Sequence, residues 1–189
     1  MMSGGLCPSS GKCCLSADTD AGAAFPAVPA LLKAGADKIS LNSAAVANPE
    51  LVRQGAETFG NQCIVVAIDV KTDPVTGKRM VYTHGGTKPT ELEAVPWAKK
   101  VVSLGAGELL VTSMDKDGTK SGFDCQLYRE LQEAVNVPII ASGGAGCIDD
   151  FVDVFTKTKV TGALAASVFH FGEMTVKDVK TALKQADVP

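Results

Sequence analysis

The sequence predicts an α/β fold of the (βα)8, or TIM-barrel, class, in which about five C-terminal βα units form a partial barrel. Two observations carry this prediction. Apolar segments of strand length alternate with amphipathic segments of helix length, at the spacing of about 30–45 residues that is typical of βα units. Polar residues also recur directly after each apolar segment, as they do at the carboxyl ends of barrel strands. No GxGxxG motif follows a predicted strand, so an open dinucleotide-binding sheet has no support.

The strands are predicted from runs of Val, Ile, Leu and Ala that are bounded by turn-forming residues. In chain order, these runs cover residues 38–42, 63–70, 108–113, 138–141 and 162–166. Residues 71–84 break the alternation, because Asp-Pro and Thr-Gly turn signals precede a β-like run. This segment predicts an excursion or small hairpin over the active face.

The helices are predicted between the strands, at residues 49–59, 92–104, 125–135 and 148–156, with a last helix at 175–186. Pro49 suits the first turn of its helix, where no backbone N–H is needed. Gly105 is a helix stop. Asp124 and Thr175 are residue types that cap the start of a helix.

Two regions are expected along the chain. Residues 1–24 are rich in Gly, Ser, Cys and Ala without periodicity, which predicts an irregular or disordered leader. The leader holds Cys7, Cys13 and Cys14, whose spacing fits no familiar zinc motif. Residues 25–189 are expected to form the partial phosphate-binding barrel.

Composition limits the function classes. The formal net charge of −3 and the pI of about 5.4 do not favour binding to nucleic acid or to a membrane surface. No apolar run approaches the roughly 20 residues of a membrane span, and the N-terminus lacks the apolar core of a secretory signal, so a cytoplasmic location is expected. His84 and His170 are far apart and predict surface or packing roles, and no metal site is expected.

Small residues after two strands predict an anion site. Ser142, Gly143 and Gly144 follow the fourth predicted strand, and Ala166 and Ser167 end the fifth. Backbone N–H groups in such loops can approach a phosphate closely, and barrel phosphate sites commonly use the last two loops. The alternative is that the glycines only form a tight turn.

A weak internal repeat predicts a second anion site. Residues 35–43 echo residues 162–167, since both contain Gly-Ala, a strand and a small hydroxyl residue that opens a helix. Asn42 and Ser43 would then bind a phosphate across the barrel, or Ser43 would only cap a helix. Two opposed sites imply a long substrate with a phosphate at each end.

Carboxylates after two strands predict acid–base chemistry. Asp69 ends the apolar run from residue 64 to residue 68 and should point into the barrel mouth. Asp117 follows the third predicted strand and could shuttle protons or bind substrate hydroxyls, while Gly118 could approach a phosphate. Asp115 is expected to be a turn residue.

Several sequence runs resemble one enzyme family. GADKISLNSAAV, VVAIDVK, GAGELLVTSMDKDGTKSGFD, VPIIASGGAG and GALAASVFHFGE are similar, in this order, to the cyclase subunits of imidazole glycerol phosphate synthases. The resemblance runs from about residue 25 to the end. The related phosphoribosyl isomerase shares a phosphate-barrel fold, but the ending AASVFHFGE and the loop DKDGTKSG resemble the cyclase more.

The resemblance implies a reaction in histidine biosynthesis. The family condenses ammonia with a bis-phosphorylated ribulosyl nucleotide to form imidazole glycerol phosphate and aminoimidazole carboxamide ribotide. Ammonia comes from a glutaminase subunit, and no metal or organic cofactor is needed. By the same resemblance, Asp69 is a catalytic acid/base. The matched substrate and phosphate positions are Asn42, Ser43, Thr112, Asp117, Gly118, Ser142, Gly143, Gly144, Ala166 and Ser167. Lys38 and Glu108 match the gate on the ammonia path, and Asp37 matches a glutaminase contact.

The family pattern also includes segments without a counterpart in residues 1–189, among them a first strand with another catalytic aspartate. We therefore expect little cyclase activity from this chain alone, and we expect it to associate through open sheet edges. The alternatives are a phosphate- or glutaminase-binding fragment without turnover, or the isomerase.

Overall fold

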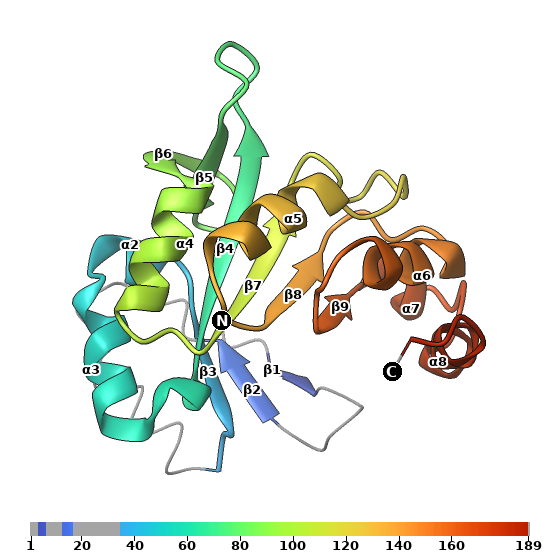
Figure 1. The fold of residues 1–189 in the computed structure, drawn as a ribbon, viewed down its shortest axis with the longest axis horizontal. Helices are drawn as coiled ribbons and strands as arrows, with labels where there is room; N and C mark the ends of the chain where they lie inside the picture. The colour runs from blue at the N-terminus through green and yellow to red at the C-terminus, as the bar shows by residue number, and fades with distance from the viewer. Residues whose placement is uncertain (1–3, 7–12, 17–34, 189) are drawn as a thin grey trace.

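A single, mostly parallel sheet organises the chain, with helices along its outer side (Figure 1). The computed structural model describes residues 4–6, 13–16 and 35–188. The sheet order is β1-β2-β3-β4-β7-β8-β9. Its strands are β1 (Gly4–Leu6), β2 (Cys13–Ser16), β3 (Lys38–Leu41), β4 (Ile64–Thr72), β7 (Glu108–Ser113), β8 (Ile139–Ser142) and β9 (Gly162–Leu164). All neighbours from β2 to β9 pair in parallel, whereas β1 pairs antiparallel with β2.

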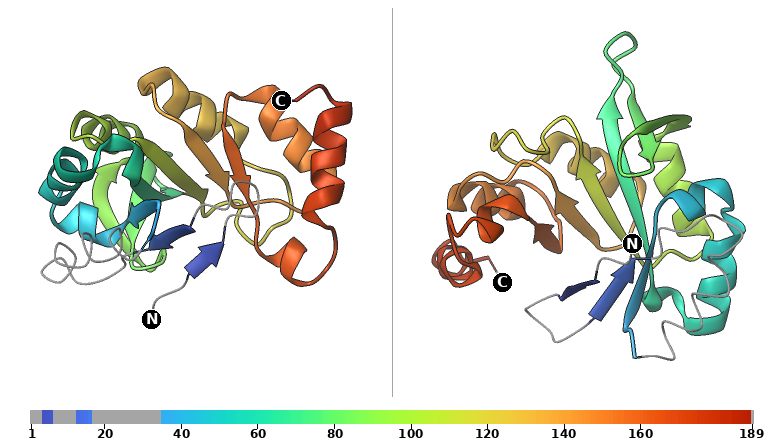
Figure 2. Two further views of the ribbon diagram at one scale, coloured as in Figure 1. Left: turned by 90° about the horizontal axis from the view of Figure 1, so that it is seen from below. Right: turned by 180° about the vertical axis from the view of Figure 1, so that it is seen from behind.

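The alternation of strands and helices confirms the predicted fold class. The helices are α2 (Ser43–Ala47), α3 (Glu50–Phe59), α4 (Ala94–Ser103), α5 (Cys125–Ala134), α6 (Ile148–Lys157), α7 (Ser167–His170) and α8 (Val176–Gln185), with a 3-10 turn η1 (Asn61–Cys63) before β4. Figure 2 shows the sheet curving with the helices on its convex side. This arrangement of βα units is that of a partial (βα)8 barrel.

Local signals placed the helix boundaries well. The Asp124 carboxylate accepts a hydrogen bond from the Leu127 N–H at 3.0 Å, and the Thr175 hydroxyl accepts one from the Asp178 N–H at 3.2 Å. Both residues cap their helices as predicted. The last strand is two residues shorter than predicted, because Ala166 already occupies the N-cap position of α7.

The predicted excursion after β4 is a long hairpin. β5 (Arg79–Thr83) pairs antiparallel with the end of β4, and β6 (Lys88–Glu93) pairs with β5. The prediction of a helix from residue 92 was therefore wrong at its start, since α4 begins at Ala94. β6 lacks an apolar run and exists because β5 offers a pairing edge, which local patterning does not reveal.

The predicted irregular leader, residues 1–24, also needs correction. β1 and β2 lie within it, and β2 adds a parallel strand to the edge of β3, with Cys14 opposite Lys38. Strand pairing with a distant partner overrides the weak local preference of these residues. Cys7 and the expected boundary between residues 24 and 25 lie outside the described residues.

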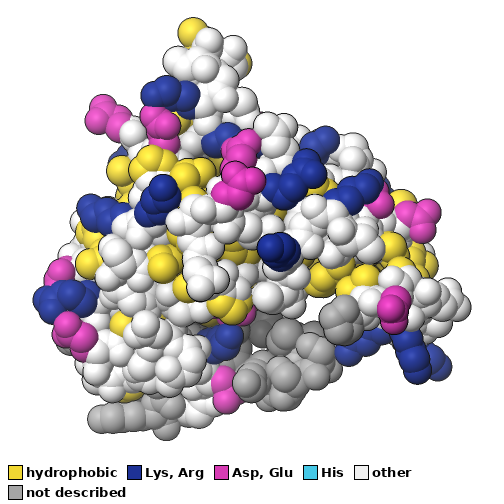
Figure 3. Space-filling model, in the orientation of Figure 1, with side chains coloured by type: hydrophobic (Ala, Val, Ile, Leu, Met, Phe, Trp, Pro, Cys, Tyr) yellow, Lys and Arg dark blue, Asp and Glu magenta, His cyan; other side chains and the backbone are white. Residues whose placement is uncertain are grey.

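The core lies between the sheet and its helices. Strand residues such as Ile39, Ile64, Leu109 and Ile139 have almost no exposed surface. They pack against helix residues that include Val52, Trp97, Leu127, Leu131, Phe151 and Val154. On the face shown in Figure 3, Lys and Arg side chains are interspersed with Asp and Glu. Among the described residues, no helix is long and apolar enough to cross a membrane.

Tyr128 joins this core to the ends of two strands. Its buried hydroxyl accepts a hydrogen bond from the Ser142 N–H at 3.1 Å and lies 2.9 Å from the Ser142 carbonyl and 3.3 Å from the Val111 carbonyl. Burial raises the pKa of Tyr128 well above its ordinary value, so the hydroxyl remains protonated and can donate.

Replacing Tyr128→Phe is expected to lower the free energy of unfolding by about 1–3 kcal/mol, because the buried Ser142 N–H loses its acceptor. Urea denaturation measures the change. Tyr82→Phe, on the half-exposed face of β5, is the matched control and should change stability by less than about 0.5 kcal/mol. Equal effects of the two substitutions would contradict this account.

Within the described residues, β1 and β9 are the ends of the sheet path, and Leu164 on β9 and Phe171 after α7 are 44% and 72% exposed. Because unpaired strand edges and exposed apolar side chains promote association, the 189-residue chain is expected to self-associate. Sedimentation velocity should show an average molecular mass that rises with protein concentration. The double substitution Leu164→Ser with Phe171→Ser should make this rise smaller. A monomer at all concentrations would refute the expectation.

Candidate functional site

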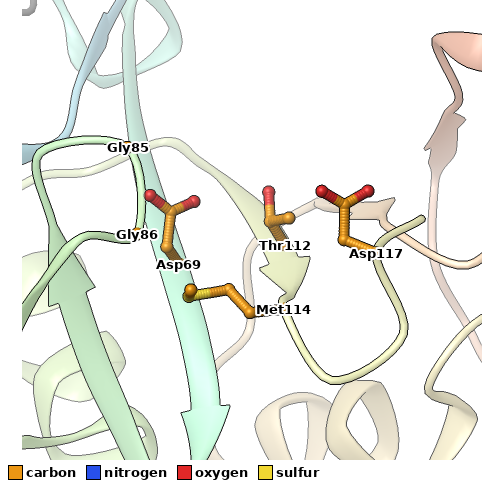
Figure 4. A pocket seen from close by; sticks show the side chains of 6 residues that line it. All are labelled: Asp69, Gly85, Gly86, Thr112, Met114 and Asp117. Atoms are coloured by element: carbon orange, nitrogen blue, oxygen red, sulfur yellow. The ribbon is translucent and has the colours of Figure 1, made fainter. Parts of the chain in front are cut away.

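The carboxyl ends of the central strands surround a cavity of about 240 Å³. Its lining residues are Asp69, Gly85, Gly86, Thr112, Met114 and Asp117 (Figure 4). Asp69 on β4 lies opposite Thr112 on β7 in the parallel register, which brings the two side chains to the same end of the sheet. Figure 4 shows the Asp69 and Asp117 carboxylates on either side of Thr112. Three of the predicted site residues therefore share one cavity.

Asn42 connects the end of β3 to this cavity. Its side-chain Nδ2 donates a hydrogen bond of 2.9 Å to Asp69 Oδ2, which orients the carboxylate. The Asn42 Oδ1 atom is buried and has no hydrogen-bond partner among the described residues. Since a buried polar atom normally finds a partner, this oxygen is suited to accept a hydrogen bond from a ligand.

Ser43 is contacted by the loop that connects β5 to β6. The backbone N–H of His84 donates to Ser43 Oγ at 2.9 Å. His84, Gly85 and Gly86 all have positive φ angles, of 55°, 63° and 81°, which fold the loop back toward the sheet. The His84 side chain is exposed, and its Nδ1 lies 3.1 Å from Thr83 Oγ1. The structure thus brings Ser43 next to the loop that lines the cavity.

Gly143, in the loop after β8, lies beside the cavity lining. A side chain at Gly143 would place its Cβ 2.6 Å from the Ser113 carbonyl and 3.4 Å from Asp117 Cβ. Only glycine fits there, because the loop after β8 passes so close to the turn after β7. The Ser142 N–H is already bound by Tyr128, so this group is engaged within the fold. Of the other predicted anion-site residues, Gly144 is buried, Ser167 is half-buried, and Gly118 and Ala166 are exposed.

The predicted gate residues lie at the opposite end of the sheet. Lys38 is the first residue of β3 and Glu108 the first of β7, and their side chains form an ion pair of 2.5 Å. β4 runs between these two strands, so the pair bridges across it. Asp37 precedes β3 and is exposed. These three residues are therefore separated from the cavity by the length of the strands.

A partly buried polar cluster ties the hairpin to the start of α5 and the end of β7. Arg79 Nη1 and Nη2 donate to the Asp124 carboxylate at 2.7 and 3.3 Å, and Arg79 Nε lies 3.2 Å from Glu130 Oε2. Asp124 Oδ2 also accepts from Ser113 Oγ at 3.1 Å. Burial acts to raise the pKa of Asp124, but the hydrogen bonds from Arg79, Leu127 and Ser113 and the Arg79 charge outweigh it, and the pKa is lowered.

Sequence reasoning missed Gly85, Gly86 and Met114 as lining residues. The turn signals predicted a hairpin over this face, but which of its residues reach the cavity depends on how β5 pairs with β4. Among the described residues, no group of His, Cys, Asp and Glu could hold a metal ion.

Asp124→Asn is expected to destabilise the protein by about 1–3 kcal/mol at neutral pH, because a charge-assisted cluster is lost. The folded-state pKa is depressed, so this contribution is present above the unfolded pKa of about 3.9 and is lost as pH falls through the lower folded-state value.

Urea unfolding of wild type and variant from pH 7 downward should therefore show a difference that shrinks in acid. Asp153→Asn is the control, because its ion pair with Lys157 is exposed and contributes little. A difference independent of pH would contradict the ionic explanation.

Comparisons with known proteins bear on this site. The family model described as "Histidine biosynthesis protein" matches residues 21–175. The chain is 69% identical over 160 residues to the imidazole glycerol phosphate synthase subunit HisF of Limosilactobacillus fermentum, covering 85% of this chain and 61% of that protein. It is 68% identical over 158 residues to the protein of the same name from Lactiplantibacillus plantarum, covering 84% and 63%. The Bacillus licheniformis protein is 58% identical, with the same coverage of 84% and 63%. The chain therefore spans about three-fifths of the length of these relatives.

Proposed function

Because the chain belongs to the histidine biosynthesis protein family, we propose that it contributes the cyclase chemistry of imidazole glycerol phosphate synthase. The substrates would be ammonia and a bis-phosphorylated ribulosyl nucleotide. The products would be imidazole glycerol phosphate and aminoimidazole carboxamide ribotide, which makes the reaction a carbon–nitrogen lyase and cyclase step. The observation that carries the proposal is the cavity at the strand ends, where Asp69, held by Asn42, and Asp117 lie on either side of Thr112.

Ring closure with ammonia requires that protons be delivered and removed around the reacting carbons. Asp69 is placed for this task, because the Asn42 amide holds one of its oxygens and its side chain faces the cavity. Asp117 on the other side of Thr112 would bind substrate hydroxyls or pass a proton. General acid–base catalysis by such groups typically contributes about 10²–10⁴-fold to a rate.

The two phosphates would bind on either side of these acids. Ser43, whose Oγ accepts from the His84 N–H and keeps its own proton to donate, would form one site together with Asn42. The Asn42 Oδ1 atom can only accept, so it would meet a hydroxyl or N–H of the substrate and not a phosphate oxygen. Gly118, Ser142, Gly143, Gly144, Ala166 and Ser167 would contribute the other. Because the Ser142 N–H donates to the Tyr128 hydroxyl, the hydroxyl of Ser142 and not its backbone N–H would bind a phosphate.

Ammonia would enter from the opposite end of the sheet. The Lys38–Glu108 ion pair lies there, and the exposed Asp37 beside it would contact a glutaminase subunit. The curated relatives carry the word "subunit" in their names, which supports a partner protein. No metal or organic cofactor is assigned a role in this proposal.

The test is to mix the 189-residue chain, in excess, with the bis-phosphorylated nucleotide and ammonium at alkaline pH and to follow both products. Binding of the nucleotide is measured separately by calorimetry. Ring closure supports the cyclase, whereas isomerisation of the aminoaldose precursor, supplied in a parallel assay, supports the isomerase alternative. Binding without turnover supports the binding-fragment alternative, and neither binding nor turnover would overturn the proposal.

The ring-closure rate of the 189-residue chain is expected to be low, and Asp69→Asn should lower it by a further factor of about 10²–10⁴ while changing nucleotide affinity much less. The reason is that the amide keeps the shape of the side chain but cannot exchange a proton. The control is Asp73→Asn, in the hairpin tip away from the cavity, which should leave the rate unchanged. A rate within about threefold of wild type in Asp69→Asn would remove this residue from the mechanism.

A further inference from the structure

Asp115 makes a contact that a simple turn residue does not need. It follows β7 by two residues, and the sequence predicted only a turn role for it. In the structure, its Oδ2 atom accepts two hydrogen bonds from Thr72, one from the backbone N–H at 2.9 Å and one from Oγ1 at 2.6 Å. Both bonds are solvent-exposed, and together they link segments 43 residues apart in the chain.

The tie connects the two segments that carry the cavity acids. Thr72 is the last residue of β4 and lies three positions after Asp69. Asp115 lies two positions before Asp117. Asp69 and Thr72 belong to one stretch of β4 that pairs in unbroken register with β5, so the strand carries both residues together. The Asp115–Thr72 contact therefore limits how far the Asp117 turn can move from the Asp69 strand.

Backbone hydrogen bonds hold the rest of the turn from Met114 to Asp117. The Met114 N–H donates to the Val70 carbonyl at 2.8 Å, and the Asp117 N–H donates to the Ser113 carbonyl at 2.9 Å. On the other side, Ser113 Oγ is fixed by Asp124, and the close approach of Gly143 leaves the turn little room. The Asp115 contact supplies the side-chain link from this turn to β4.

We propose that Asp115 is a positioning residue that sets the spacing of the Asp69 and Asp117 carboxylates across the cavity. Asp115 does not line the cavity itself, so it acts through the backbone of the turn. The expected effect on the ring-closure rate rests on the proposed cyclase function, whereas the expected effect on the stability of the turn after β7 does not. A misplacement of about 1 Å in a catalytic group can cost on the order of 100-fold in rate.

The chain offers a matched control for this residue. Asp73 in the hairpin tip also accepts hydrogen bonds from a threonine, with its Oδ1 atom 2.7 Å from the Thr76 N–H and 2.9 Å from Thr76 Oγ1. These bonds are local, three residues apart, and join no cavity segment. Asp73→Ala therefore removes the same chemistry without touching the cavity spacing.

The experiment compares four variants with the wild-type chain in ring closure, nucleotide binding and amide hydrogen exchange. Asp115→Ala should lower the maximal ring-closure rate by about 10–100-fold and change the half-saturating concentration by less than about threefold. Asp115→Asn keeps an acceptor for the Thr72 N–H and should recover most of that loss. Thr72→Val removes only the hydroxyl, with no change of charge, and should lower the rate by about tenfold. Asp73→Ala should match wild type.

Adding Thr72→Val to Asp115→Ala should cost little more than Asp115→Ala alone, because both remove the same contact. In the absence of any ligand, Asp115→Ala should also speed exchange of the Met114 and Asp117 amides and leave those of α5 unchanged.

Two outcomes would overturn the proposal. The first is exchange of the Met114 and Asp117 amides that is unaltered by Asp115→Ala. The second is equal loss of activity in Asp115→Ala and Asp115→Asn, which would indicate a role of the charge itself. A wild-type chain that neither binds nor converts the nucleotide would instead refute the cyclase function, and the exchange measurement would still decide whether Asp115 holds the turn.

Discussion

The parallel pairing of β4 with β7 positions the rest of the molecule. Six residue pairs in register run from Val65 opposite Glu108 to Val70 opposite Ser113. One end of this pairing places Asp69 beside Thr112 at the cavity, and the other brings Glu108 within reach of Lys38 across β4. A shift of one residue would turn every side chain of a strand to the opposite face, so the apolar core residues and the polar ends enforce the same register.

Buried polar contacts hold the strand ends that this register brings together. Tyr128 binds the backbone of Ser142 at the end of β8, and Asp124 binds Ser113 at the end of β7. Removing the Tyr128 hydroxyl or the Asp124 carboxylate would leave a buried polar group of Ser142 or Ser113 without its hydrogen bond, which costs about 1–3 kcal/mol of folding free energy. The loops beyond these ends are more open, since Asp117 and Gly118 are exposed. Firm strand ends below exposed loops are the arrangement on which barrel enzymes build their sites.

Prediction from the sequence succeeded where the signal is local. The five main strands begin and end within two residues of their predicted bounds, because each is a continuous apolar run between turn residues. The caps at Asp124 and Thr175 follow from hydrogen bonds to residues three positions away. Prediction failed for β2 and β6, whose short or polar sequences become strands only because a neighbouring strand offers an edge.

The sequence by itself determined the family, the order of the five main strands along the chain and the identity of the polar residue that follows each of them. Only the tertiary structure decided which of those residues meet. Asn42 contacts Asp69, 27 positions away in the chain, and Thr72 contacts Asp115, 43 positions away. The Ser142 N–H donates a hydrogen bond to the Tyr128 hydroxyl. The physical reason is that strand formation and capping depend on near neighbours, whereas contacts between strand ends depend on the register of the sheet and on how each loop packs against the next.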